Sequence, residues 1–359
     1  MFRGLEVVEH CASIASLLQG ETTQNVANGM DIHSYRTPLG VCGGIAPFNF
    51  PVMIPLWMFP VAITCGNTYI MKPSERVAGS CVKLLELLEA TGIPKGVVNM
   101  VNGDKTVVDS MLDHPDIKAL SFVGSTNIAQ YIYERGCSKG KRVQSNGGAK
   151  NHCVVMPDYN MEAAASAIVG AAFGASGQRC MALSVTVLVG DAKNCLPLVE
   201  KKVKDLKISA GKENPDLGPL ISPLQVQKIK NWIDKAENNG GKILVDGRNY
   251  KNSKYPNGNF FGPTIVELTA ENYKTNESYT EELFGPVLTV ICVDSYEEAL
   301  NIVNSNEYGN GTSIFTRSGF YARDFVNRAE PGQVGVNVPI PVPLPMFSFT
   351  GNKSKLLIK

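Results

Sequence analysis

Short runs of β-branched and other apolar residues alternate with segments of helical periodicity along the first part of the chain. Such runs predict strands, and here they cover residues 39–46, 68–71, 97–101, 119–123 and 152–156. The segment 77–90, between the second and third runs, repeats apolar residues at helical spacing. Its predicted apolar stripe, which would pack on a sheet, consists of Val77, Cys81, Leu84, Leu85 and Leu88. This alternation predicts βαβ units and therefore a parallel sheet.

A second alternating series follows residue 180 and predicts a second α/β lobe that begins near residue 149. Its predicted strands cover residues 184–189, 242–245, 263–266, 287–292, 312–315 and 334–338. We therefore predict an α/β protein with one lobe over residues 1–148, another over residues 149–338 and a C-terminal connector over residues 339–359. The proline-rich run 338–345 favours extended backbone at the start of this connector.

Composition excludes several functional classes. The most apolar stretch, residues 51–65, contains three prolines and is too short to cross a bilayer, so it predicts a buried, kinked helix. A net charge of +1 without blocks of Lys or Arg gives no electrostatic indication of binding to nucleic acid or to an anionic membrane. Nine cysteines, never spaced as CxxC, predict a reducing compartment and no zinc site. The first residues match neither a secretory signal nor a transit peptide.

Cys180 is the candidate nucleophile. It follows a stretch of small residues, 170–177, whose missing side chains would let a ligand approach the thiol. Arg179 and a possible helix terminus would lower the pKa of this thiol and raise its thiolate fraction. The alternative is that Cys180 is a buried small hydrophobic residue, as most free cysteines are.

Polar residues follow two of the predicted strands. Asn49 stands between Pro47 and Pro51, where a rigid amide would be a good oxyanion donor, although such an Asn alone is more often a turn residue. Lys72 and Glu75 follow the next strand, at the place where nucleotides bind in open α/β sheets, and could hold ribose hydroxyls. An exposed turn with ordinary surface charges explains that motif equally well when it is taken alone.

Two further junctions carry possible ligand contacts. Gly124 and Ser125 could offer backbone N–H groups and a hydroxyl to a phosphate at a helix N-terminus, although the segment lacks a GxGxxG fingerprint. Glu282 stands two residues before Phe284, ahead of a predicted strand. This pair would suit a ribose diol and a flat ring, but alone it is an ordinary acidic turn.

The motifs PFNFP, KPSE, FVGS, GGAKN, GQRC and EELFGP occur in this order along the chain. Together they resemble the aldehyde dehydrogenase superfamily, and the resemblance covers the whole chain. Within it, the chain is similar to the CoA-acylating branch that oxidises methylmalonate and malonate semialdehydes, on the segments WMFP, AKNH and VGVNVPIPVPLPMFSFTG. Asn146 fits this branch, because related hydrolytic enzymes carry a glutamate base at that position.

The resemblance implies a mechanism. The Cys180 thiolate adds to the aldehyde, Asn49 and the Cys180 N–H hold the resulting alkoxide, and NAD accepts the hydride. Losing one oxyanion donor typically reduces the rate by ~10²–10³, so Asn49 ranks just behind the cysteine. Because Asn146 stands in place of a base, the thiol of coenzyme A rather than water is expected to attack the thioester on Cys180 and accept its acyl group. The expected products are acetyl-CoA or propionyl-CoA, with loss of carbon dioxide.

The same resemblance implies roles for further residues. Arg179 and Arg3 are the candidates for the substrate carboxylate, because an arginine fork matches that group. No metal is expected. The residues implied to contact NAD are Ala46, Phe48, Lys72, Glu75, Arg76, Ser125, Glu282 and Phe284.

An architecture is implied as well. The first lobe would be a Rossmann-like NAD-binding domain, N-terminally incomplete, with a remnant oligomerisation hairpin near residues 21–38, and the second lobe would be the catalytic domain. Relatives are mitochondrial matrix enzymes and longer at both ends. We therefore expect a truncated chain that forms a homo-oligomer, dimer or tetramer, weakened by the truncation. A hydrolytic aldehyde dehydrogenase and an inactive truncated relative are the alternatives.

Overall fold

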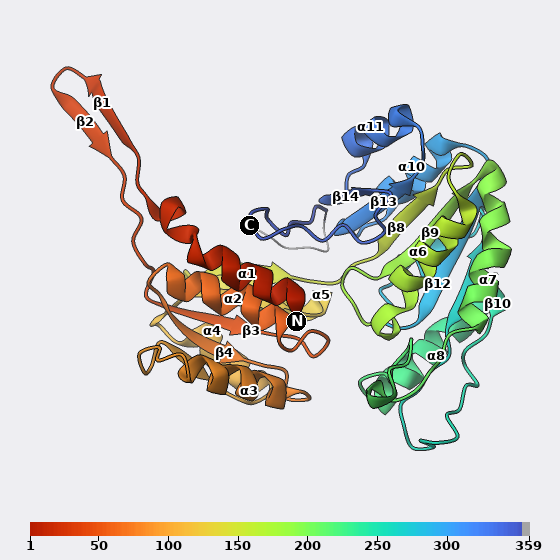
Figure 1. The fold of residues 1–359 in the computed structure, drawn as a ribbon, viewed down its shortest axis with the longest axis horizontal. Helices are drawn as coiled ribbons and strands as arrows, with labels where there is room; N and C mark the ends of the chain where they lie inside the picture. Colours follow the sequence, from red (N-terminus) through yellow and green to blue (C-terminus); the bar gives the residue numbers. More distant parts are fainter. Residues whose placement is uncertain (354–359) are drawn as a thin grey trace. The chain divides into compact units, whose positions relative to one another are not determined.

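The computed structural model describes residues 1–353 as two compact units (Figure 1). Unit 1 comprises Met1–Gly147 and Leu344–Ser348, and unit 2 comprises Gly148–Pro343 and the described residues from 349 onward. The described part of the predicted connector 339–359 is thus divided between the units, and residues 354–359 lie outside the description. Within residues 1–353, no helix is long and apolar enough to cross a membrane.

Unit 1 is built around a five-stranded sheet in the order β5-β4-β3-β6-β7, in which all neighbouring strands are parallel. The strands are β3 (Val41–Ile45), β4 (Thr68–Lys72), β5 (Val98–Met100), β6 (Ile117–Val123) and β7 (Arg142–Asn146). The first four confirm predicted strands. The sequence pattern does not predict β7, because Val143 is its one strongly apolar residue.

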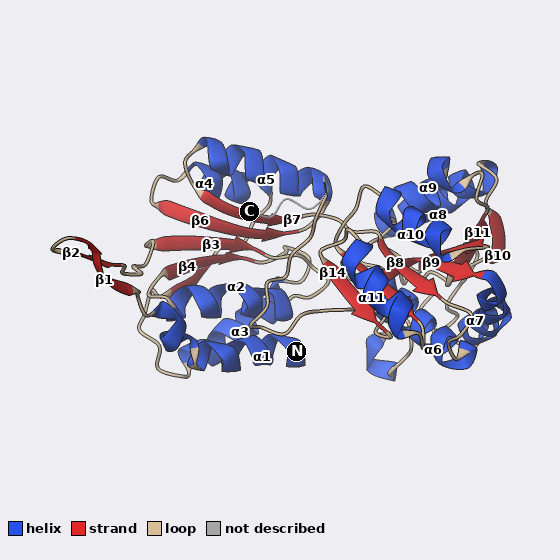
Figure 2. Ribbon diagram, turned by 90° about the horizontal axis from the view of Figure 1, so that it is seen from above, coloured by secondary structure: helices blue, strands red, loops and turns tan. Residues whose placement is uncertain are grey.

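Helices cover both faces of this sheet, as Figure 2 shows. On one face, Leu112 of α4 and Ile132 of α5 join an apolar cluster with residues of β3 and β6. On the other face, Phe59 of α2 and Cys81 of α3 form a second cluster, and α1 packs on α2. The buried helix predicted for 51–65 is therefore confirmed as α2. The helices of unit 1 are α1 (Phe2–Ala12), α2 (Met53–Thr64), α3 (Ala78–Glu89), α4 (Lys105–Asp113) and α5 (Thr126–Ser138).

An antiparallel hairpin of β1 (Thr22–Ala27) and β2 (Met30–His33) projects from unit 1, within the predicted range 21–38 (Figure 1). Every residue of both strands is exposed, including the apolar Val26, Met30 and Ile32. A two-stranded hairpin with no covered face is only marginally stable by itself.

Unit 2 contains a seven-stranded sheet in the order β10-β11-β12-β9-β8-β13-β14. Its strands are β8 (Asn151–Val155), β9 (Leu183–Val189), β10 (Lys242–Val245), β11 (Thr264–Leu268), β12 (Val287–Val293), β13 (Gly311–Phe315) and β14 (Gln333–Val336). All strand positions confirm the predicted series. The parallel arrangement fails only at β10, which is antiparallel to β11. The reason is that residues 246–263 join these strands without the crossover helix that a parallel pair requires.

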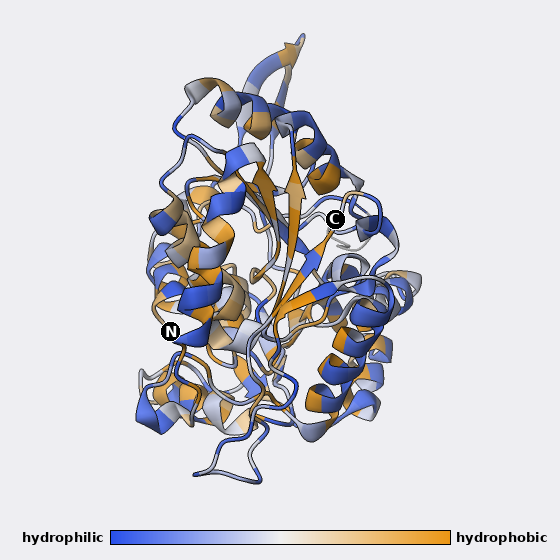
Figure 3. Cartoon of the chain, turned by 90° about the vertical axis from the view of Figure 1, so that its right-hand side faces the viewer, coloured by the Kyte–Doolittle hydropathy of each residue, from blue (hydrophilic) through white to orange (hydrophobic). Residues whose placement is uncertain are grey.

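Two helical layers enclose this second sheet (Figure 2). Alternate strand residues face opposite layers: Val154 and Val187 join the cluster of α8, α10 and α11, whereas Cys153 and Leu188 join that of α6 and α7. Figure 3 shows the sheet strands mainly in the hydrophobic colour, whereas the helices carry hydrophilic outer faces. The predicted α/β fold class is confirmed. The helices of unit 2 are α6 (Met161–Phe173), α7 (Leu196–Lys204), α8 (Pro223–Asn238), α9 (Glu277–Thr280), α10 (Tyr296–Ser305) and α11 (Gly319–Arg328).

A reciprocal cap fixes the start of α10. The Glu298 N–H donates to Ser295 Oγ at 3.3 Å, and the Ser295 N–H donates to Glu298 Oε2 at 3.1 Å. We predict that Ser295→Ala lowers the free energy of unfolding by about 1 kcal/mol, because an N–H at the helix start loses its partner. Urea unfolding followed by circular dichroism measures this change.

Ser166→Ala is the matched control. Ser166 is exposed in the middle of α6, and its hydroxyl only donates back to Glu162 O within the same helix. Replacing it with alanine should leave stability unchanged or slightly higher, because alanine is the better helix former. Equal losses in the two variants would contradict the importance of the cap.

Candidate active site

Cys180 lies in the turn between a short 3-10 helix, Gly174–Gly177, and β9. Residues 175–177 have left-handed backbone, with φ of 52°, 53° and 67°. This conformation costs an ordinary residue about 1–2 kcal/mol, so other contacts must stabilise the turn. A Cβ atom at Gly177 would lie 2.0 Å from Gly285 O, and glycine is therefore required at that position.

Residues 218–221 stabilise the turn through hydrogen bonds on one side. The Ser176 hydroxyl donates to Gly218 O at 2.6 Å. The Gln178 side chain accepts from the Ile221 N–H at 3.0 Å and donates to Pro219 O at 3.3 Å. These hydrogen bonds offset the backbone strain and give the residues before the cysteine one conformation.

Burial dominates the acidity of the Cys180 thiol. Desolvation first, and then the nearby Glu282 carboxylate, raise the pKa of this thiol, which lies at about 11. Hydrogen bonds from the backbone N–H groups of Met181 and Cys180, together with the Arg179 charge, act in the opposite direction. The prediction of a lowered pKa is therefore wrong: Arg179 does favour the thiolate, but desolvation is larger. The helix ends that precede Cys180, at Phe173 and Gly177, are C-terminal ends, which do not stabilise a thiolate.

Two hydrogen bonds join residues 281–282 to the residues that precede β8. The Ala149 N–H donates to Glu282 Oε1 at 2.9 Å, and Lys150 Nζ donates to Glu281 O at 2.6 Å. Burial raises the pKa of Glu282 to about 7 and lowers the pKa of Lys150 to about 7. Glu282 is thus no ordinary acidic turn residue. Its pKa and that of Lys150 both lie near neutral pH.

These side chains line a pocket within unit 2, to which Lys150, Arg179, Glu282 and Phe284 contribute. Phe284 has a left-handed φ of 49°, and its carbonyl accepts from Gln225 Nε2 at 3.1 Å. The pocket combines two cationic side chains, one carboxylate and one aromatic ring.

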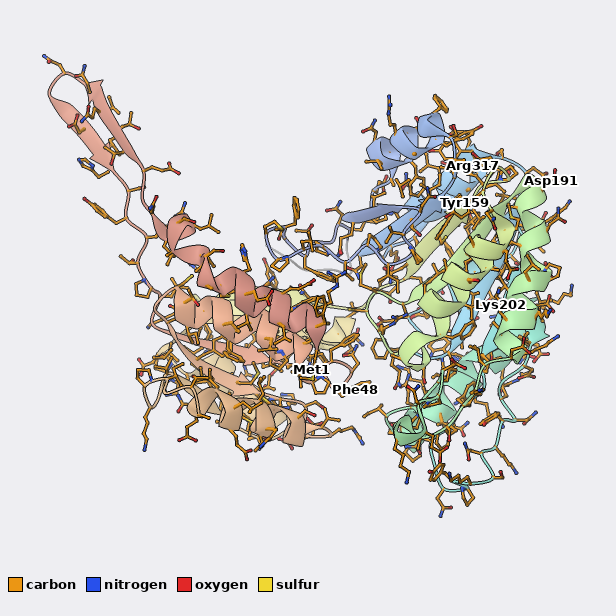
Figure 4. The ribbon with its side chains drawn as sticks, viewed as in Figure 1. Met1, Phe48, Tyr159, Asp191, Lys202 and Arg317 are labelled. Atoms are coloured by element: carbon orange, nitrogen blue, oxygen red, sulfur yellow. The ribbon has the colours of Figure 1, made fainter. Side chains whose placement is uncertain are left out.

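In unit 1, polar segments meet at the edge formed by the carboxyl ends of parallel strands. Asn49 follows β3, as does Phe48, which Figure 4 labels. Ser125 follows β6 at the start of α5, and Asn146 ends β7. The chain reverses the direction of strand addition between β3 and β6, and nucleotide ligands bind at such switch points.

Lys72 ends β4 at the same edge. It is buried at 5% exposure, and its Nζ pairs with Glu75 Oε2 at 3.0 Å. Its carbonyl accepts from the Ala46 N–H at 3.0 Å, which brings the ends of β3 and β4 together. The pKa of Glu75 is lowered by a backbone hydrogen bond and by Lys72. The interpretation of Lys72 as an ordinary surface charge is excluded, whereas Glu75 and Arg76 lie in an exposed turn.

A family model described as the aldehyde dehydrogenase family matches residues 1–355. The chain belongs to the aldehyde dehydrogenase family. Among curated members, it is 56% identical over 355 residues to the acylating, mitochondrial methylmalonate-semialdehyde/malonate-semialdehyde dehydrogenases of Rattus norvegicus and Homo sapiens. The match covers 99% of this chain and 66% of each relative, so the chain spans just under two thirds of their length.

Solved members of the family have the same fold. A Sinorhizobium meliloti protein assigned as a methylmalonate-semialdehyde dehydrogenase, solved with NAD, matches with a TM-score of 0.96 and 46% identity. That match covers 100% of this chain and 73% of the other. The methylmalonate-semialdehyde dehydrogenase of Oceanimonas doudoroffii matches with the same TM-score and identity over 99% of this chain and 73% of the other. The predicted aldehyde dehydrogenase-like fold is confirmed.

The two arginines assigned to a substrate carboxylate already have partners in this family member. Arg179 donates through one nitrogen to Ala171 O at 2.7 Å and to Gly170 O at 3.1 Å, near the end of α6. Its Nε is buried and, within residues 1–353, has no hydrogen-bond partner. Arg3 forms an exposed pair with Glu6 at 2.9 Å on α1. Their role toward substrate stays a prediction.

Three polar residues near Cys180 are not identified by sequence reasoning. Lys150 and Asn151 lie inside the GGAKN motif, which could have marked them. Asn310 directly precedes β13, and no sequence signal distinguishes it from other asparagines before strands. The amides of Asn151 and Asn310 both donate to the Cys180 carbonyl, at 2.8 and 3.1 Å.

We predict that Glu282→Gln accelerates alkylation of Cys180 by iodoacetamide at pH 9 by about 3- to 10-fold. The Glu282 carboxylate raises the pKa of the thiol, so its neutral replacement should lower that pKa and increase the thiolate fraction. Glu282 ionises with a pKa of about 7, and the difference should therefore disappear below that pH. Mass spectrometry of the peptide containing Cys180 follows the reaction.

Glu281→Gln provides the control at the neighbouring position. Glu281 is not among the main groups that shift the pKa of Cys180; its hydrogen bond with Lys150 uses the backbone carbonyl, and its carboxylate raises the pKa of Lys150. This variant should react like the unmodified protein. A Glu282→Gln rate that equals the control rate at pH 9 would show that the carboxylate does not act on the thiol.

Proposed function

We propose that this protein is an NAD-dependent, CoA-acylating aldehyde dehydrogenase that acts on malonate and methylmalonate semialdehydes. The observation that carries the proposal is Asn146, which ends β7 with an amide where hydrolytic relatives would carry a carboxylate. Its Oδ1 is buried and lacks a hydrogen-bond partner among the described residues. A neutral amide is not a general base, so Asn146 does not activate water. The acylating enzymes that are 56% identical to this chain support the same conclusion.

The covalent chemistry is assigned to Cys180. Its thiolate forms a C–S bond to the aldehyde carbon, and the carbonyl electron pair becomes an alkoxide that Asn49 and the Cys180 N–H stabilise. NAD, when bound, supplies the hydride acceptor that makes oxidation to a thioester possible. The thiolate of coenzyme A then attacks the thioester carbon, and Cys180 departs as a thiolate. Carbon dioxide is lost by cleavage of the bond between the substrate carboxylate and the α-carbon; the electron pair of that bond stays on the α-carbon as an enolate, which takes up a proton, so acetyl-CoA or propionyl-CoA results.

Unit 1 offers groups that fit NAD. The switch point between β3 and β6 is where dinucleotides bind in such sheets, and α5 begins there with N–H groups that suit a phosphate. Among the described residues, the Ser125 side chain makes no capping hydrogen bond. Buried Lys72 has N–H donors beyond the one that Glu75 accepts. The residues proposed to contact NAD are Ala46, Phe48, Lys72, Glu75, Arg76, Ser125, Glu282 and Phe284.

We propose Arg179 and Arg3 as partners of the substrate carboxylate. Arg179 supports this role because it lines the unit 2 pocket next to the nucleophile in sequence, with an unpaired Nε among the described residues. For Arg3 the support is the family resemblance alone. An arginine–carboxylate pair would orient the semialdehyde before Cys180 attacks.

A homo-oligomer in mitochondria completes the proposal. The exposed apolar residues of the hairpin, Val26, Met30 and Ile32, support assembly because a covering chain would remove them from water. The compartment is supported by the mitochondrial names of the relatives.

We predict that steady NADH formation from malonate semialdehyde requires coenzyme A and is abolished by Cys180→Ala. The physical reason is that no carboxylate at position 146 activates water, so the thioester waits for a thiol. Asn146→Glu should introduce turnover without coenzyme A. Absorbance of NADH, with and without coenzyme A, measures all three results.

Steady turnover without coenzyme A in the unmodified protein would assign a hydrolytic reaction instead. Absence of NADH even in the first turnover, from a folded sample, would contradict dehydrogenase activity and indicate a non-catalytic role. A burst of one NADH per chain without coenzyme A, followed by arrest, is the result that the acylating mechanism requires.

We further predict that Lys72→Gln weakens NAD binding by about 10-fold or more, because a buried charged donor to the cofactor is lost. Titration calorimetry measures the affinity. The control is Lys83→Gln: Lys83 pairs with Glu86 at 2.9 Å with the same three-residue spacing, but its side chain is 71% exposed on α3. Equal affinities for the two variants would exclude Lys72 from the cofactor site.

A further inference from the structure

The Cys180 carbonyl accepts hydrogen bonds from two buried side-chain amides. Asn151 Nδ2 donates to it at 2.8 Å and Asn310 Nδ2 at 3.1 Å. The two asparagines are only 4% and 3% exposed. Asn151 begins β8 and Asn310 directly precedes β13, the neighbouring strand. The carbonyl next to the nucleophile is thus bound at the amino ends of two adjacent strands.

Each amide is itself oriented by a second contact. The Gly311 N–H donates to Asn151 Oδ1 at 3.0 Å, and Gln333 Nε2 donates to Asn310 Oδ1 at 3.2 Å. With the oxygen of each amide used as an acceptor, its NH₂ group must face the Cys180 carbonyl. Asn151 Nδ2 also donates to Ala182 O at 2.8 Å and so spans the turn.

The peptide between Cys180 and Met181 transmits this constraint. A trans peptide is planar, so its C=O and N–H groups point in opposite directions. Holding the Cys180 carbonyl therefore fixes the direction of the Met181 N–H. Of the groups that lower the pKa of the Cys180 thiol, this N–H has the largest effect.

We propose that Asn151 and Asn310 are positioning residues that, by holding the Cys180 carbonyl, aim the Met181 N–H at the Cys180 sulfur and stabilise its thiolate. Neither side chain needs to touch substrate. A catalytic role for this arrangement rests on the proposed function, in which Cys180 is the nucleophile. The effect of the arrangement on the acidity of the thiol is independent of that function. In a buried site, a fixed N–H favours the anion that desolvation opposes.

The effect of the two asparagines on the thiol can be distinguished from the effect of the charged groups around the sulfur. Glu282 disfavours the thiolate and Arg179 favours it, and Lys150 is held on the Glu281 carbonyl. Replacing a neutral asparagine changes none of these charges. A shift in the titration of Cys180 in such a variant therefore reports the hydrogen bonds.

The test measures alkylation of Cys180 by iodoacetamide between pH 7 and 12 in the full chain, followed by mass spectrometry of its peptide. Asn151→Ala and Asn310→Ala should each raise the pH midpoint by about one unit, which slows the reaction about tenfold below the midpoint. The control is Asn306→Ala, because buried Asn306 likewise donates to a backbone carbonyl, that of Tyr279. Its midpoint should equal that of the unmodified protein.

An unchanged midpoint in folded Asn151→Ala and Asn310→Ala would overturn the proposal, as would the same shift in Asn306→Ala. Should both alanine variants fail to fold, Gln333→Met decides the question. This near-isosteric change keeps both asparagines but removes the donor that orients Asn310, so a smaller upward shift supports the proposal and no shift overturns it. Alkylation requires neither NAD nor aldehyde. An inactive protein with the expected shifts would therefore refute the proposed function alone.

Discussion

A strand that lies parallel to its predecessor requires the chain to return to the starting end of the sheet, and helices make that return through most of both units. This constraint collects the carboxyl ends of the unit 1 strands at one edge. Asn49, Lys72, Ser125 and Asn146, distant in sequence, all follow or end strands there. Where a loop replaces the helix, between β10 and β11, the strands become antiparallel. The connections therefore decide where polar groups can gather.

Burial is the second general influence on the chemistry. It raises the pKa of Cys180 and Glu282 and lowers that of Lys150, in each case against the charged form. Local contacts oppose it: the Ala149 N–H on Glu282, and backbone N–H groups on the cysteine sulfur. The unit 2 site thus consists of groups whose charges depend on fixed hydrogen bonds. Small displacements of the backbone would change the reactivity of the thiol, which explains why the turn around it is anchored so densely.

The turn that contains Cys180 illustrates how strain and anchoring combine. Residues 175–177 adopt left-handed backbone, and Gly177 packs against the Gly285 backbone where any side chain would clash. Ser176 and Gln178 secure the turn on one side, and the asparagines of β8 and β13 hold the carbonyl of Cys180. Because separate segments of unit 2 hold it, the turn can keep a conformation that the local sequence would not choose.

Sequence by itself determined the α/β class, most of the strands, the buried helix α2 and the family. These features depend on local apolar periodicity and on short motifs. It did not indicate β7, whose residues are mostly polar, or the antiparallel β10, whose direction depends on the connection that follows. The acidity of Cys180, the burial of Lys72 and the contact of Asn310 were decided only by the tertiary structure. Desolvation and hydrogen-bond partners depend on residues that the fold brings together from distant parts of the chain. A local sequence pattern does not indicate which distant residues become neighbours.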